Sequence, residues 1–229
     1  MKINRNFSTF LAECVGTFSL VLFGCSAIVV DELFGGSIGH VGISFSFGII
    51  VMVMIYSFGN ISGAHLNPAV TIGFFFSKRL KLKDIPIYIS AQLIGAFLAA
   101  LLLRIAFPQS STLGATLPKV SGVFAFIVEI ILTFILMLVI LNVSIGHMEK
   151  GIMAGVAIGS LITLEAMVGG PLTGASMNPA RSLGPAVIGL NLSDIYIYIF
   201  APIIGAVSAS PMCSLIQGDK CCGSIAERN

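Results

Sequence analysis

Asn67-Pro68-Ala69 and Asn178-Pro179-Ala180 are the same three residues, and each opens an apolar segment that is too short to cross a membrane. The first segment covers residues 67–77 and the second covers residues 178–189. At about 1.5 Å per residue, such a helix reaches roughly 17 Å, which is about half of a hydrocarbon core about 30 Å thick. Two segments of this length that enter from opposite sides would meet near the middle of the bilayer and together span it.

Both stretches have the residue order of a helix start. Asparagine is a favoured N-cap, and proline at the next position lacks an N–H that would have no intrahelical partner there. Each helix would point its positive dipole end at the middle of the membrane, and an Asn whose oxygen caps the helix would keep its NH2 free. Irregular backbone at this depth needs a cover of protein or a polar cavity, so the pattern predicts a water-filled lumen. The alternative is that each Asn-Pro marks an ordinary loop turn. The presence of two matched copies of the motif disfavours this alternative.

The composition is that of a membrane protein with several helical spans. The chain has 229 residues, of which 56% are hydrophobic and 10% are charged, whereas soluble domains carry about 25% charged residues. The formal net charge of +2 is too small to indicate a nucleic-acid partner. The five cysteines form no disulfide framework. Metal binding or lipidation of Cys221-Cys222 is a minor alternative, because no His or second Cys pair lies at ligand spacing, so we expect no metal and no cofactor.

Six longer apolar segments can each span about 30 Å with some tilt. Their approximate bounds are 9–30, 41–59, 86–107, 121–143, 151–170 and 195–216. Pro86 after Asp84 suits a helix start, and Asp194 is expected to cap the last segment.

Basic residues lie mostly on one side of these spans. With the N-terminus inside, the cytoplasmic loops and ends hold Lys2, Arg5, Lys78, Arg79, Lys81, Lys83, Lys150, Lys220 and Arg228. Only Lys119 and Arg104 fall outside, and Arg181 lies in the membrane. Because cytoplasmic loops carry the excess of Lys and Arg, we expect a multi-pass protein of the plasma membrane with both termini in the cytoplasm.

The chain is expected to be a single domain over 1–229 that repeats itself, with halves at about 1–115 and 116–229. Residues 61–70 match residues 172–181, and residues 91–96 match residues 201–206. Glu13 with Thr17 matches Glu129 with Thr133. Three spans per half is an odd number, so the second copy must be inverted across the bilayer, as in many transport proteins.

With an Arg directly after the second motif, the pattern resembles the aquaporin, or major intrinsic protein, family over nearly the whole chain. The resemblance implies an all-α membrane fold, with six transmembrane helices and two reentrant half-helices in two inverted repeats around one narrow pore per subunit. It also implies a homotetramer in the lipid bilayer. Asn67 and Asn178 would donate to passing water, the two helix ends would repel cations and interrupt a proton wire, and Arg181 would lie at the outer constriction.

Carried over by spacing from the motifs, the family's four-residue filter falls on Phe47, Ala166, Ala175 and Arg181. Water-selective members usually have a His where this chain has Ala166, and two small side chains should leave a wider, less polar constriction. Residues 169–185 look most like the nodulin-26-like branch, which passes glycerol, urea and uncharged metalloid acids besides water. Against a dedicated glycerol facilitator, Ser182 stands where that group has Asp.

Acids inside a membrane are normally functional, but in this family Glu13 and Glu129 are structural supports that bond the loop backbone behind the half-helices. Their symmetric recurrence favours this role over a proton relay. Glu165 has no symmetric partner; it faces the outer vestibule or pairs with a neighbour, and both stay open. His65 precedes the first motif and is expected to line the cytoplasmic half of the pore, with pH gating as the lesser alternative.

The sequence therefore predicts a passive channel for water and small uncharged solutes, without enzyme activity. A strictly water-selective pore is the alternative. A proton- or ion-coupled carrier would need an acid on the pore axis, for which Glu165 is the only candidate, and two converging positive helix ends disfavour cations. A membrane adhesion protein would need large extramembrane faces, whereas the loops here are short.

Overall fold

The structure is a computed structural model of the chain that describes residues 4–144, 148–218 and 221, with the backbone alone for 148–152. Its elements are α1 (Arg5–Leu33), α2 (Gly39–Ser62), α3 (Pro68–Phe76), the 3₁₀ turn η1 (Leu82–Asp84), α4 (Ile85–Ala106), α5 (Gly122–Val143), α6 (Met148–Thr173), α7 (Pro179–Gly189) and α8 (Ile195–Gln217). Several residues named above lie outside the described part of the chain: Lys2, Lys220, Cys222, Arg228 and the side chain of Lys150.

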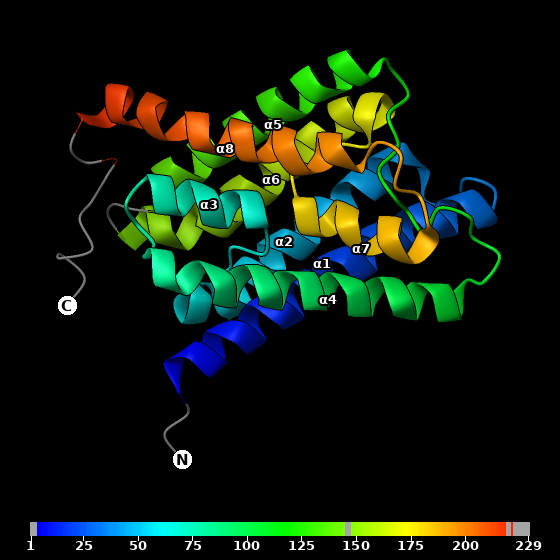
Figure 1. Cartoon of the computed structure of the whole chain (residues 1–229), viewed down its shortest axis with the longest axis horizontal. Coiled ribbons are helices and arrows are strands. Elements are labelled where there is room, and N and C mark those ends of the chain that lie inside the picture. Colours follow the sequence, from blue (N-terminus) through cyan, green and yellow to red (C-terminus); the bar gives the residue numbers. More distant parts are fainter. Residues whose placement is uncertain (1–3, 145–147, 219–220, 222–229) are drawn as a thin grey trace.

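Six of the described helices are long and apolar enough to cross a membrane. The other two, α3 and α7, have 9 and 11 residues. The predicted spans and half-helices are confirmed, with ends that differ by only a few residues. In Figure 1 the long helices run roughly along the horizontal axis and surround α3 and α7, which lie near the centre.

The helices pack in matching pairs. The most extensive contacts join α1 to α4 and α5 to α8, while α2 packs on α6. A glycine allows each of the first two pairs to approach closely. A Cβ on Gly95 of α4 would lie 2.2 Å from the carbonyl oxygen of Cys14 in α1. A Cβ on Gly205 of α8 would lie 2.4 Å from the carbonyl oxygen of Ile130 in α5.

The two short helices begin with side-chain caps, as the sequence predicts. The side-chain oxygen of Asn67 accepts from the backbone N–H of Ala69 at 2.8 Å. That of Asn178 accepts from Ala180 at 3.0 Å and from Arg181 at 3.3 Å. Each proline follows directly as the first helical residue, where its missing N–H costs no hydrogen bond.

The expectation that Asp194 caps the last span is wrong. Asp194 precedes α8, but its side chain makes no capping bond. The preceding turn already supplies backbone partners, because the N–H of Ile195 donates to the carbonyl of Leu192 at 3.2 Å and that of Ile197 donates to the carbonyl of Asp194 at 3.0 Å.

The sequence predicted no disulfide framework, but one pair of cysteines is bonded in the structure. Cys213 in the last turns of α8 is disulfide-bonded to Cys221, with a Cα–Cα distance of 5.7 Å, while Cys14 and Cys25 are free. The chain reverses after α8 at Gly218, which has a φ of 62° that glycine adopts without strain. A spacing of eight residues along the chain does not reveal this reversal.

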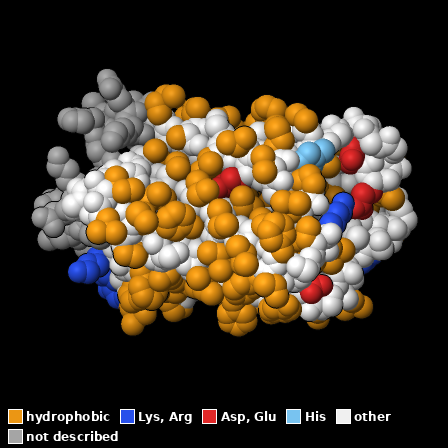
Figure 2. All heavy atoms as spheres, turned by 90° about the horizontal axis from the view of Figure 1, so that it is seen from above, with side chains coloured by type: hydrophobic (Ala, Val, Ile, Leu, Met, Phe, Trp, Pro, Cys, Tyr) orange, Lys and Arg blue, Asp and Glu red, His pale blue; other side chains and the backbone are white. Residues whose placement is uncertain are grey.

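The outer surface suits a lipid environment. Figure 2 shows hydrophobic side chains over most of one face, with most of its charged side chains towards the two ends. Exposed large apolar residues occur on all six long helices, Phe23, Ile49, Ile105, Val123, Val168 and Phe200 among them. Such a surface is unfavourable in water and favourable in hydrocarbon.

We expect Gly95→Ala to destabilise the fold by about 1–3 kcal/mol, because the added methyl group would overlap backbone and force α1 and α4 apart. Thermal unfolding in detergent measures the effect. Gly59→Ala in α2 is the matched control, because the nearest atom to its Cβ lies 4.0 Å away. Equal stability of the two variants would contradict the close packing of α1 on α4.

Candidate functional site

The two half-helix tips meet through crossed hydrogen bonds. Asn67 Nδ2 donates to the carbonyl of Met177 at 2.7 Å, and Asn178 Nδ2 donates to the carbonyl of Leu66 at 2.8 Å. Each amide therefore binds the residue that precedes the other asparagine. The sequence predicted that both N–H groups of each amide stay free, but the tertiary contact uses one of them. Leu66 and Met177 have φ values of 53° and 52°, so the two loops turn their carbonyls inward in the same way.

Glu13 holds the first loop from behind. The carboxylate is fully buried and accepts four hydrogen bonds. The donors are Ser62 Oγ at 2.6 Å, the backbone N–H groups of His65 at 2.8 Å and Leu66 at 2.7 Å, and Gln92 Nε2 at 2.8 Å. Peptide groups that have no helical partner at this depth are thereby satisfied.

Glu129 does the same for the second loop with one donor fewer. It is fully buried and accepts from Thr173 Oγ1 at 2.7 Å and from the backbone N–H groups of Ser176 at 2.9 Å and Met177 at 2.8 Å. In the internal sequence match, Pro202 occupies the position of Gln92, so α8 offers no side-chain donor there. The two halves are symmetric in their backbone and unequal in this support.

A cavity of about 1080 Å³ runs past both asparagines. One end lies among basic residues, which are Arg5, Arg79, Lys81 and Lys83. Its lining continues through His65 and the two loops to Phe47, Ala166, Ala175 and Arg181. Glu13 and Glu129 are buried behind this wall. The candidate filter residues, both asparagines and His65 therefore line one cavity.

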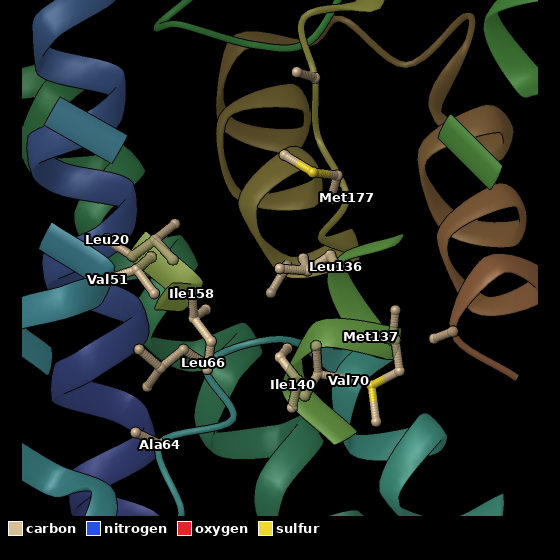
Figure 3. Close-up of a cluster of buried hydrophobic side chains, with 14 of the residues drawn as sticks. Leu20, Val51, Ala64, Leu66, Val70, Leu136, Met137, Ile140, Ile158 and Met177 are labelled. Carbon is tan, nitrogen blue, oxygen red and sulfur yellow. The ribbon is translucent and has the colours of Figure 1, made fainter. Parts of the chain in front are cut away.

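Much of the wall on the His65 side is apolar. Figure 3 shows Leu20, Val51 and Ile158 converging with Leu66 from the first loop, and Leu136 and Ile140 lie across from them. All six side chains line the cavity. Along this part of the wall, the two asparagines and His65 lie next to an apolar surface.

The guanidinium group of Arg181 uses only some of its hydrogen-bond donors. It is 2% exposed, and its Nη1 donates to the carbonyl of Gly114 at 2.8 Å. Its guanidinium carbon lies 4.9 Å from the centre of the Phe47 ring, which suits a cation–π contact. Within the described chain its Nε and Nη2 have no hydrogen-bond partner. Ala166 and Ala175 carry only methyl groups, so neither side chain can accept a hydrogen bond from these two buried donors.

Several contacts around the filter were not apparent from the sequence. The Phe47 ring occupies space left by Gly24, where a Cβ would lie 2.2 Å from the ring. The loop between α4 and α5 supplies the Gly114 carbonyl for Arg181 and the Thr116 hydroxyl, 2.7 Å from that of Ser182. Gln92 was detectable in principle, because an amide in an apolar span requires a partner. Nothing in the sequence marked Gly114 as a partner of Arg181.

His65 and Glu165 occupy different environments. The His65 ring is stacked between Phe74 and Tyr88, at centroid distances of 4.5 and 4.4 Å, and its Nδ1 lies 3.2 Å from Thr71 Oγ1. Glu165 is 5% exposed, and among the described residues neither of its carboxyl oxygens has a hydrogen-bond partner. The structure thus gives Glu165 neither the vestibule exposure nor the paired neighbour that the sequence left open.

A sequence model described as "Major intrinsic protein" matches residues 1–212. The chain belongs to this family. It is 44% identical over 218 residues to Aquaporin NIP3-1 of Arabidopsis thaliana, covering 92% of this chain and 68% of the relative. It is 42% identical over 208 residues to Nodulin-26 of Glycine max, covering 90% of this chain and 77% of the relative. The resemblance to the nodulin-26-like branch is confirmed, and family members are channels rather than enzymes.

A solved structure supports the same fold. The X-ray structure of the aquaglyceroporin from Plasmodium falciparum matches with a TM-score of 0.79 and 28% sequence identity. The match covers 92% of this chain and 99% of that one. The family's arrangement of six spans and two half-helices is therefore confirmed for this chain.

We expect Glu129→Gln to destabilise the second loop by about 1–3 kcal/mol, because an NH2 group would face donors where an oxygen now accepts. Hydrogen exchange of residues 173–178 and thermal unfolding measure the effect. Glu165→Gln is the matched control, since Glu165 accepts no hydrogen bond within the described chain and its change should leave that loop protected. Faster exchange in both variants alike would argue against a specific support by Glu129.

Proposed function

We propose that this chain is a passive channel that conducts water and small uncharged solutes, such as glycerol, urea or metalloid acids, and excludes protons and ions. The observation that carries the solute range is the filter. Arg181, whose Nε and Nη2 have no hydrogen-bond partner within the described chain, lines the cavity together with Phe47, Ala166 and Ala175. The names of the relatives, which include aquaporins and an aquaglyceroporin, support a channel for this class of molecule.

The chemistry of the filter fits a neutral molecule with both oxygen and carbon. Hydroxyl or carbonyl oxygens accept from the Arg181 fork, while C–H groups pass against the Phe47 ring and the two alanines. Two methyl groups in place of larger polar side chains leave room for more than a single file of water. An ion at this constriction would lose part of its hydration shell against the Phe47 ring and the two alanine methyl groups, and that loss is expensive.

The asparagine tips provide the barrier to protons and cations. Two half-helix N-termini, each with a partial positive charge of about half a unit, converge where Asn67 and Asn178 lie. The amide N–H that is not used by the opposite loop donates to a passing water oxygen. A water oriented by two donors cannot accept a proton from its neighbour, so the hydrogen-bonded wire is interrupted.

The assembly and its placement follow the same proposal. The channel is a homotetramer in the plasma membrane with both termini in the cytoplasm, each subunit carrying its own pore. An even number of spans supports placing the ends on one side, and the excess of basic residues near Lys78 supports the cytoplasm as that side.

A coupled carrier and a strictly water-selective pore are the two alternatives, and each requires a different cavity lining. A coupled carrier needs a titratable acid on the transport path. Among the described residues that line the cavity the only carboxylate is Asp84, at the end that also holds Lys81 and Lys83. A strictly water-selective pore needs a tighter filter than two alanines provide, and it is the alternative that the experiment must separate.

Stopped-flow light scattering on proteoliposomes tests the proposal. The same vesicles are challenged with an impermeant osmolyte and then with glycerol or urea. We expect fast shrinkage followed by fast reswelling, at rates linear in solute concentration and unchanged by membrane potential. Shrinkage without reswelling would establish a water-selective channel, and saturable, potential-dependent flux would establish a carrier.

We expect Ala166→His to lower glycerol and urea permeability by about tenfold or more, equivalent to about 1.4 kcal/mol of added barrier, because the imidazole narrows the filter opposite Arg181. Water permeability should fall much less. Ala166→Ser is the control of nearly unchanged size, and both rates should stay close to the original there. If the histidine variant passes glycerol as before, residue 166 does not set the solute range.

A further inference from the structure

A second cavity lies on the outer surface, between the end of α3 and the helix α8. It is a groove of about 700 Å³ that shares no lining residue with the pore. Its lining is formed by Phe76, Lys78, Ile203, Ile204, Val207, Ser208, Ser210, Pro211 and Ser214. The proposed channel function makes no use of this groove.

The depth of the groove matches one leaflet of a bilayer. α3 starts where the two half-helices meet and extends for 9 residues, a rise of about 14 Å, close to half of a hydrocarbon core of about 30 Å. Lys78, two residues beyond α3, therefore lies at the level of the headgroups. The stretch of α8 from Ile203 to Ser214 rises about 17 Å along the same leaflet.

The walls of the groove suit a hydrocarbon chain. Phe76 and Ile204 are 52% and 47% exposed, and Ile203 and Val207 continue the apolar surface. The hydroxyl of Ser208 donates to the carbonyl of Ile204 at 2.8 Å, so this polar group on the groove is satisfied within α8. The Ser214 hydroxyl likewise donates to the carbonyl of Ser210 at 3.2 Å, so two of the three hydroxyls on the groove are paired within α8 and an acyl chain would bury them at little cost.

The end of the groove carries a cation. Lys78 is exposed, and within the described chain it has no ion-pair or side-chain hydrogen-bond partner. Its backbone is held in a left-handed conformation, φ 61°, by an N–H bond to the carbonyl of Phe75 at 2.9 Å. The neighbouring Arg79 is engaged elsewhere, because its guanidinium donates to Ser144 Oγ and to the carbonyls of Leu141 and Cys221. Lys78 is thus the cation that faces the lipid headgroups here.

We propose that this groove binds an anionic phospholipid of the leaflet on the Lys78 side, with its phosphate on the Lys78 ammonium and an acyl chain along α8. Charge complementarity selects the headgroup, and the match between groove and leaflet depth selects a lipid over a free phosphate. Under the proposed orientation this is the cytoplasmic leaflet, where anionic lipids attract basic residues near the surface.

Native mass spectrometry of the detergent-purified oligomer, titrated with phosphatidylglycerol or phosphatidylcholine, tests this site. We expect phosphatidylglycerol to bind more tightly. Lys78→Gln should weaken it about fivefold, the effect of about 1 kcal/mol per lysine at an anionic surface. Lys78→Arg should restore binding. Lys83→Gln, on the same side but outside the groove, is the control for general charge and should change little.

A second variant tests the groove itself. Ser208→Phe fills it from an exposed position that does not line the pore, and we expect lipid binding to be lost while water flux is kept. Equal weakening by Lys78→Gln and Lys83→Gln would overturn the site in favour of non-specific attraction. Unchanged binding by Ser208→Phe would exclude the groove, and dissociation of the oligomer by that variant would show that a second copy of the chain occupies it. Binding is measured without transport, so its failure is distinct from failure of the channel.

Discussion

The crossed hydrogen bonds between the Asn67 and Asn178 tips are the contact on which the rest of the structure depends. Each side chain uses its oxygen to start its own helix and one N–H to hold the opposite loop. Two half-helices can stop in the middle of a membrane only if their non-helical backbone finds partners, because no lipid can supply them. The asparagines close the front of this junction, and Glu13 and Glu129 close its back.

This arrangement explains why polar and apolar groups are distributed as they are. Carboxylates, hydroxyls and a glutamine are concentrated behind the loops, where Glu13 and Glu129 accept from peptide N–H groups and Gln92 donates to Glu13. The pore side of the same loops keeps few polar groups, namely inward carbonyls, the asparagine amides and the Arg181 fork. A conducting path needs enough hydrogen bonds to admit a solute and too few to retain it. The buried supports therefore serve transport without touching the solute.

The sequence predicted the helices better than the contacts between them. The described helices and the proline-marked starts of the two half-helices could be located from local patterns and internal repetition. The candidate filter residues, which line one cavity, came from the resemblance to the family. Asp194 shows the limit of local rules, because a backbone turn took the place of its side-chain cap. Cys213 and Cys221 show another limit, since their pairing depends on a chain reversal at Gly218.

By itself, the sequence determined where the chain is helical, which segments are long enough to span a bilayer and where two helices stop halfway. These properties depend on neighbours in the chain: apolar length, an Asn before a Pro and a repeated pattern. Only the tertiary structure decided that each Asn amide binds the opposite loop and that Glu129 has one donor fewer than Glu13. It also decided that Arg181 Nη1 binds the carbonyl of Gly114, while Nε and Nη2 have no partner in the described part of the chain. Those facts join residues about 50 to 110 positions apart, and a hydrogen bond between such segments is specified by packing rather than by any local propensity.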